Sequence, residues 1–234
     1  MTDDANRTES RRTDFIDAIV AACGELGLSL NAEQTEGMWR HYGLMLEENR
    51  RTNLTRITDP VQAAVKHYAD SLASLPWADE AVLADAYVLD VGTGAGFPAV
   101  PLAICRPAWR ILAIDSAKKK ADFVGSAAAS LGLDGLSVQH ARARELAGHV
   151  APFDLVTCRA VADLVKCLRE VRRLIAGGGW LVCYTTPQAL DRFTPSQRAQ
   201  ANRLGFEPLH RHDYRLILAD GHIIRVLAIW QRRA

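Results

Sequence analysis

The chain has 234 residues, of which 49% are hydrophobic and 24% are charged, and its formal net charge is +1. This composition is typical of a globular protein and excludes global disorder, while the charge excludes a surface that is basic all over. A protein of this length has room for one large α/β domain with a small helical addition, and any binding of RNA would need a local basic patch.

The first 13 residues are polar, carry both signs of charge and lack the apolar centre of a secretory signal, so we expect a loose tail over residues 1–13. We expect no membrane span, because no run of about 18 apolar residues occurs. The five cysteines are odd in number, scattered, and form no Cys-x-x-Cys pair: Cys23, Cys105, Cys158, Cys167 and Cys183. They predict reduced thiols in a cytoplasmic protein without a metal site.

A helical extension is predicted over residues 14–80. Asn31 and Gln34 form a capping pair, and Met38, Tyr42 and Met45 follow at helical spacing. A second helical stretch begins near residues 59–60 and continues to Pro76.

The pattern then changes to short apolar runs separated by helical patterns. The predicted strands are residues 87–91, 111–115, 136–139, 153–158 and 180–184, and the predicted helices between them include residues 121–131 and 161–175, the second ended by three glycines at 177–179. Strands without alternation predict a parallel sheet with helices on both faces. A helix near 195–204 and a hairpin around Asp220-Gly221, with an antiparallel strand, would complete the unit. We therefore predict an α/β, Rossmann-like domain over residues 81–234, with a mostly parallel seven-stranded sheet.

A glycine-rich turn follows the first predicted strand and indicates the cofactor. It contains Asp90, then Gly92, Gly94 and Gly96 at every second position, and then Phe97. A dinucleotide fingerprint would need its third glycine at position 97. Gly-x-Gly-x-Gly with an acid two residues earlier is instead the usual form in methyltransferases that use S-adenosylmethionine.

Asp115 is the second indication, because it ends the next predicted strand, 19 residues after Gly96. A carboxylate there can accept hydrogen bonds from ribose hydroxyls. Two other interpretations remain open: a structural turn with Asp115 as a helix cap, and a nicotinamide-dependent oxidoreductase.

From about Tyr42 to its C-terminus, the chain resembles the bacterial 16S rRNA small-subunit methyltransferase G family, also called glucose-inhibited division protein B. The matching words are Asn49-Arg-Arg-Thr-Asn53-Leu-Thr55, His67-Tyr-Ala-Asp70-Ser-Leu72, Leu89 to Pro98, Pro101 to Ile104, Asp115-Ser116, Lys119, Phe123, Arg142-Ala143, Phe153-Asp154 and Arg159-Ala160. The first two words lie outside the generic methyltransferase fold, so the resemblance to this particular family depends on them.

The resemblance implies a class I methyltransferase that uses S-adenosylmethionine to methylate guanine N7 in the 530 loop of 16S rRNA. The partner would be 16S rRNA or the 30S subunit; no protein partner or membrane is indicated, and we expect a monomer. The expected cofactor residues are Asp90, Gly92, Gly94, Gly96, Phe97, Asp115, Ser116, Ala143, Arg144 and Arg159. A salt bridge is the alternative role for Arg159.

The chain departs from the family's pattern in four ways. Arg144 stands where the family usually has Glu, and Thr185-Thr186 replaces a Lys-Gly pair. Ala99 replaces a glycine, and Cys158 stands where Ser is common. The first two concern the adenine end of the cofactor site and the rim of the substrate site.

Guanine N7 already carries a lone pair, so its methylation requires no general base. Asp70 is the candidate catalytic group, because a carboxylate could stabilise the positive charge that the base gains; a helix-surface or capping role is the alternative. The candidates for RNA contact are Asn53, Arg56, His67, Lys119 and Thr185. Structural or solvated roles remain open for these residues. Two alternative functions also remain open: methylation of a small molecule or another RNA, and a non-catalytic module that binds S-adenosylmethionine.

Overall fold

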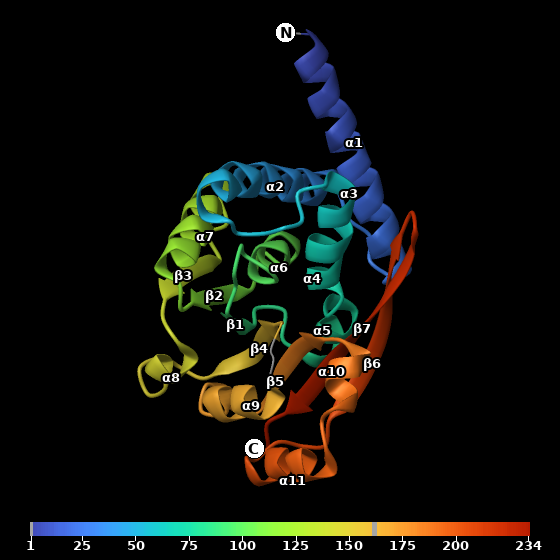
Figure 1. The fold of residues 1–234 in the computed structure, drawn as a ribbon. Coiled ribbons are helices and arrows are strands. Elements are labelled where there is room, and N and C mark those ends of the chain that lie inside the picture. The colour runs from blue at the N-terminus through green and yellow to red at the C-terminus, as the bar shows by residue number, and fades with distance from the viewer. Residues whose placement is uncertain (1, 161–162) are drawn as a thin grey trace.

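One seven-stranded sheet organises the computed structural model, which describes residues 2–160 and 163–234 (Figure 1). The strand order is β3-β2-β1-β4-β5-β7-β6. The strands are β1 (Tyr87–Val91), β2 (Arg110–Asp115), β3 (Leu136–His140), β4 (Phe153–Arg159), β5 (Ile175–Thr185), β6 (His210–Leu218) and β7 (Gly221–Gln231). The first five are parallel, and β7 runs antiparallel to both β5 and β6. This confirms the predicted fold class and the C-terminal hairpin.

The N-terminal part of the chain is helical. Its elements are α1 (Thr2–Glu25), α2 (Ala32–Thr52), α3 (Pro60–Ala63), the π-helical turn η1 (Ala64–Ala69), α4 (Asp70–Leu72) and α5 (Leu75–Ala81). The predicted capping box at Asn31 and Gln34 is present. At the other end of α2, Asn53 takes a left-handed conformation with φ 52°, which stops the helix before the next segment.

Helix α1 begins at Thr2, so a helix replaces the loose tail that the sequence predicted; Met1 lies outside the described residues. Long-range contacts explain the difference. Arg12 forms an ion pair with Glu36 at 2.7 Å, and Arg11 donates to the Tyr42 hydroxyl at 3.1 Å. Local sequence patterns carry no information about such contacts between α1 and α2.

Among the described residues after β1, the helices are α6 (Ala99–Cys105), α7 (Lys118–Leu131), α8 (Ala143–Leu146), α9 (Leu164–Val171), α10 (Pro187–Asp191) and α11 (Pro195–Arg203). The sequence predicted a helix over 161–175, ended by glycines. Instead α9 ends at Val171, and Gly179 lies within β5, where a Cβ would come within 3.0 Å of the Phe153 carbonyl oxygen. Close approach of β4 requires a glycine there. Residues 161–162 lie outside the described residues.

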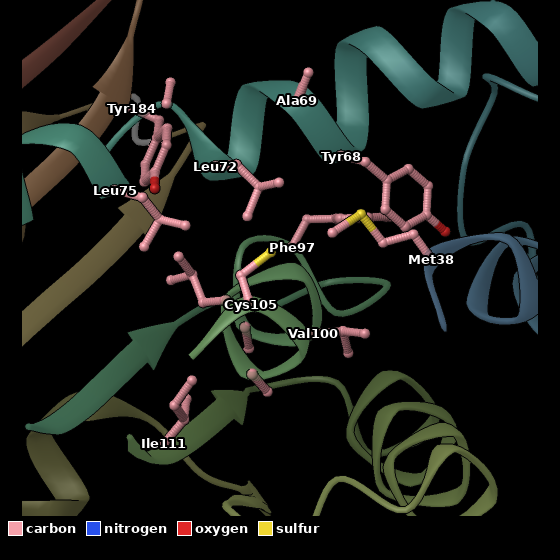
Figure 2. Close-up of a cluster of buried hydrophobic side chains, with 14 of the residues drawn as sticks. Met38, Tyr68, Ala69, Leu72, Leu75, Phe97, Val100, Cys105, Ile111 and Tyr184 are labelled. Atoms are coloured by element: carbon pink, nitrogen blue, oxygen red, sulfur yellow. The ribbon is translucent and has the colours of Figure 1, made fainter. Parts of the chain in front are cut away.

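Alternate strand residues face two hydrophobic cores. Val88 belongs to the core beneath the N-terminal helices, and the next residue, Leu89, belongs to the core beneath α9 and α11. Figure 2 shows the first core, where Met38 of α2, Tyr68 of η1 and Ile111 of β2 lie between helices and sheet. Burial on both faces explains why the strands are continuous apolar runs.

The strand order reverses at β1, whose neighbours are β2 and β4. In open α/β sheets, ligands bind at the carboxyl ends of the strands beside such a reversal. The loops after β1 and β4 both leave the sheet here. Within the described ranges, no helix combines the length and apolar character needed to cross a membrane.

Candidate cofactor and substrate site

The glycine loop turns back on the end of β2 directly after β1. Gly92, Gly94 and Gly96 all have positive φ, at 75°, 61° and 97°, a region that favours glycine. The N–H groups of Gly92 and Thr93 donate to the Ile114 carbonyl at 2.8 and 3.0 Å. The three predicted glycines therefore shape one tight turn at the strand reversal.

Asp115, at the end of β2, holds this loop in place. Its Oδ2 accepts from the Gly94 N–H at 2.9 Å, and its Oδ1 accepts from the Ala117 N–H at 2.8 Å. A carboxylate offers about four acceptor positions, so two remain for a ligand hydroxyl. Asp115 therefore has the capping role that the sequence left open, and its carboxylate can still accept hydrogen bonds from a ribose.

Asp90 lies inside the sheet and is fully buried. Its Oδ1 accepts from the Thr157 hydroxyl on β4 at 3.0 Å. Burial raises the pKa of this carboxyl to about 6, because the charged form loses its hydration. Asp90 therefore joins β1 to β4 beneath the loop.

A cavity of about 400 Å³ opens beside the loop. Four of the predicted cofactor residues line it together: Gly92, Ser116, Ala143 and Arg144. A Cβ added at Gly92 would meet no atom within 4 Å, so the backbone faces open space there. Apolar walls from Val91 and Ile114, with polar groups at the edge, suit an adenosine moiety.

Phe97 does not line this cavity and is buried in the core that the sheet shares with the helical extension. Its ring stacks on His67 with centroids 4.7 Å apart and an interplanar angle of 18°. The guanidinium carbon of Arg159 lies 5.9 Å from the Phe97 centroid. Phe97 thus connects the glycine loop to the helical extension.

The two family-specific motifs, residues 49–55 and 67–72, hold His67 in this contact with Phe97. The Asn49 side chain accepts from the Thr55 N–H at 2.8 Å, and the Thr55 hydroxyl lies 2.9 Å from His67 Nε2. Burial, followed by the nearby Arg159 charge, lowers the pKa of His67 to about 4. His67 is therefore a neutral ring at pH 7 that links the loop after α2 to η1.

A second cavity, of about 360 Å³, lies at the carboxyl ends of β4 and β5. Its lining includes three of the predicted site residues: Asp70, Arg159 and Thr185. Thr186 and Arg225 also line it. The predicted catalytic and rim residues therefore meet in one place, across the junction of the helical extension with the sheet.

Arg159 is held by several acceptors. Its Nε lies 3.1 Å from Asp70 Oδ2, and its two terminal nitrogens donate to the carbonyls of Lys66 and His67 at 2.7 and 3.2 Å. Both carbonyls belong to η1, and π-helical turns occur frequently at functional sites. The salt bridge considered for Arg159 is thus present in the structure.

Sequence reasoning missed two residues around Asp70. The Tyr214 hydroxyl donates to Asp70 Oδ1 at 2.7 Å, and Arg225 Nε lies 3.8 Å from the same oxygen. Tyr214 on β6 and Arg225 on β7 are paired across the hairpin. A lone arginine within the apolar run of β7 was the available signal.

The other candidates for RNA contact do not gather at this cavity. Asn53, Arg56 and Lys119 are exposed, and Asn53 serves as the cap of α2. Lys119 lines a separate cavity of about 370 Å³, together with Arg51. Arg56 and Lys119 therefore lie outside the two cavities at the carboxyl ends of the strands.

Comparison with known proteins places this geometry in context. Residues 34–211 match the rRNA small subunit methyltransferase G family. A ribosomal RNA small subunit methyltransferase G from Leuconostoc citreum is 31% identical over 91% of this chain and 90% of its own length. A protein of the same name from Solibacter usitatus is 41% identical over 70% of this chain and 76% of its own length.

Solved structures with low sequence identity share the fold. The YcgJ protein of Bacillus subtilis matches with a TM-score of 0.57 and 18% identity, over 72% of this chain and all of that one. A precorrin-6y C5,15-methyltransferase from Geobacter metallireducens matches with a TM-score of 0.52 and 15% identity, over 78% and 92%. At these identities the likeness concerns the arrangement of strands and helices alone.

Proposed function

The chain belongs to the rRNA small subunit methyltransferase G family, and from this premise we propose that it transfers a methyl group from S-adenosylmethionine to guanine N7 in the 530 loop of 16S rRNA. One observation carries the proposal: two cavities flank the strand reversal, one lined by the predicted cofactor residues and the other by Asp70, Arg159 and Thr185. A cofactor and a target base would thus occupy neighbouring sites.

The first cavity suits the cofactor's adenosine end. S-adenosylmethionine supplies an electrophilic methyl group when bound. We assign its ribose to Asp115 and Ser116, and its adenine to the wall formed by Ala143 and Arg144. The Arg144 side chain, which stands where the family usually has Glu, is exposed. The main chain at this position can therefore still contact the adenine.

The second cavity is where we place the guanine. N7 has no proton to lose, so the protein's task is to position the base and exclude water, which is worth up to about 7–11 kcal/mol in favourable cases. Asp70 already faces two arginines, Arg159 and Arg225, whose charges exceed its own. We therefore propose Asp70 chiefly as a positioning residue that orients Arg159 and Arg225 toward the base.

In this reaction, exposed cationic side chains would contact the RNA backbone. We assign them to Arg56 and Lys119, and a rim contact to Thr185. His67 is neutral and stacked, and Asn53 caps α2, so both would act on RNA only by shaping the segments beside the cavity.

Single-turnover methylation with labelled cofactor tests the proposal, with 30S subunits, naked 16S rRNA and a metabolite pool offered separately. We expect label only in 16S rRNA, as N7-methylguanine in the 530 loop, located by chemical cleavage at the modified base. This design also shows whether the assembled subunit or the free RNA is the substrate.

Two other outcomes would contradict the proposal in different ways. Label in metabolites or in another RNA would keep the methyltransferase but change its substrate, and Thr185-Thr186 at the rim is the feature that favours this alternative. Cofactor binding without transfer to any substrate would indicate a non-catalytic binding module.

A further inference from the structure

Three cysteines that are far apart in the sequence meet beneath the site. Cys158 is on β4, Cys167 on α9 and Cys183 on β5, and their sulfur atoms all lie within 4.8 Å of one another. Cys158 Sγ is 3.3 Å from Cys167 Sγ and 3.1 Å from Cys183 Sγ. The scattered thiols that the sequence predicted thus include one cluster.

The fold brings these thiols together. Cys158 and Cys183 are register partners on neighbouring parallel strands, and both belong to the core that faces α9. Cys167 belongs to the same core. The exposed fractions are 1% for Cys158, 8% for Cys167 and 0% for Cys183, so an oxidant in solution meets Cys167 first.

Two chemistries are open to such a cluster, a soft metal ion and a disulfide. A cation bound at about 2.3 Å from each thiolate would hold the sulfurs about 3.8–4.0 Å apart, wider than the two contacts observed here. Three thiolates would also place negative charge in an apolar core. A disulfide adds no charge, and its sulfurs approach to about 2.05 Å.

We propose that Cys158 and Cys167 form a reversible oxidative modification site, in which a hydroperoxide converts the two thiols into a disulfide. The Cys167 thiolate attacks the terminal oxygen of the hydroperoxide and becomes a sulfenic acid. The O–O bond breaks, and an alkoxide leaves, or hydroxide where the oxidant is hydrogen peroxide. The Cys158 thiol then attacks the Cys167 sulfur and forms the S–S bond. The sulfenic S–O bond breaks, and its hydroxyl group takes up the proton of the Cys158 thiol and leaves as water. One peroxide is reduced and two thiols are oxidised.

The direction of attack agrees with the hydrogen bonding in the cluster. Cys158 and Cys167 are in hydrogen-bond contact at 3.3 Å, and either thiol can donate. This contact lowers the pKa of Cys167 and raises the pKa of Cys158. Thiolates are the reactive form of cysteine, which favours Cys167 as the thiol that is first oxidised.

The disulfide would join two parts of the site. Cys158 directly precedes Arg159, which lines the second cavity, and α9 contributes Lys166 and Glu170 to the first. A bond between β4 and α9 would therefore fix the two cavity walls to each other.

Peptide mapping of the full-length chain tests the proposal without reference to catalysis. The reduced protein is treated with hydrogen peroxide, alkylated while denatured, and digested with trypsin without reductant. We expect residues 145–159 linked to residues 167–169, a loss of two of the five free thiols, and recovery of all five with dithiothreitol. Linkage of residues 145–159 to residues 174–192 would instead join Cys158 to Cys183 and overturn the assignment.

Variants show which thiols are required. Cys158→Ala and Cys167→Ala should each abolish the link, while Cys183→Ala and the more distant Cys105→Ala should retain it. Retention of all five thiols after peroxide treatment of the native chain would overturn the proposal. So would copper or zinc that is bound at one ion per chain, resists a chelator and is lost in the Cys158→Ala variant.

Discussion

Asp70 is the residue on which the helical extension and the sheet converge. It is 3% exposed and contacts Arg159, Tyr214 and Arg225. Removing the charge would leave Arg159 and Arg225, whose side chains are partly buried, without the carboxylate that they share. The Tyr214 hydroxyl, by contrast, contributes one hydrogen bond.

We therefore expect Asp70→Asn to lower the single-turnover methylation rate by at least about tenfold, equivalent to about 1.4 kcal/mol. Tyr214→Phe is the matched control, because it removes one contact and keeps the carboxylate; its rate should stay within about threefold of the parent. Cofactor binding by both variants is measured in parallel. Equal rates for Asp70→Asn and the parent chain would remove Asp70 from the positioning role.

His67 makes stability depend on pH. Its pKa is about 4 in the folded chain and about 6.5 in the unfolded chain, so between these values the unfolded state binds more protons. The stabilisation is complete above about pH 6.5 and is lost as the pH falls toward 4. At pH 5 the loss from this residue is on the order of 2 kcal/mol.

Urea unfolding at about pH 7.5 and pH 5 measures this effect. His67→Gln, which cannot titrate in this range, should lose less stability than the parent chain between the two pH values, whatever its stability at pH 7.5. An equal loss in both chains would mean that His67 keeps an ordinary pKa in the folded state.

At the scale of elements, Gly96 of the glycine loop differs from other glycines with positive φ because its backbone is closely packed. Gly96 has φ 97°, and a Cβ there would lie 2.7 Å from Val100 Cγ2. Gly148 has a similar φ of 84°, but a Cβ there would meet nothing within 4 Å. The pair therefore isolates the contribution of close packing from that of backbone conformation.

Gly96→Ala should lower the free energy of unfolding by about 3 kcal/mol, from backbone strain and overpacking together. Gly148→Ala should cost about 1 kcal/mol, because only the strain applies. Denaturant unfolding compares the two variants with the parent chain. Similar losses for both would show that Val100 relaxes and that the packing at Gly96 is not restrictive.

The elements also show what a sequence can predict. Asp90, the three glycines and Asp115 lie within 26 positions of one another, so strand and turn patterns were enough to place them together. Tyr214 lies 144 residues from Asp70, and their contact depends on the hairpin register and on where β6 meets the helical extension. No local pattern contains that information. The same holds for α1, where Arg11 and Arg12 contact Tyr42 and Glu36 of α2.

At the scale of the whole molecule, the helical extension and the sheet build one site. Side chains from α1 and α2, among them Phe15 and Met38, share a hydrophobic core with Val88 and Ile111 of the sheet. Asp70 and Arg159, one from each part, line the same cavity. One of the sequence motifs that mark the family, His67 to Leu72, lies in the extension and contributes Asp70 to the cavity that we propose for the substrate.

The net charge of +1 gives the whole molecule no general attraction for RNA, so backbone binding must come from a few free cations. Arg56 and Lys119 are exposed, whereas Lys118 is paired with Asp122 at 2.7 Å. Each phosphate contact with single-stranded RNA contributes about −0.7 to the slope of log affinity against log salt. Arg56→Ala and Lys119→Ala should each reduce the slope for 30S binding by about 0.7. Lys118→Ala should reduce it less, because its charge is already balanced, and an unchanged slope in all three variants would place the RNA backbone on another surface.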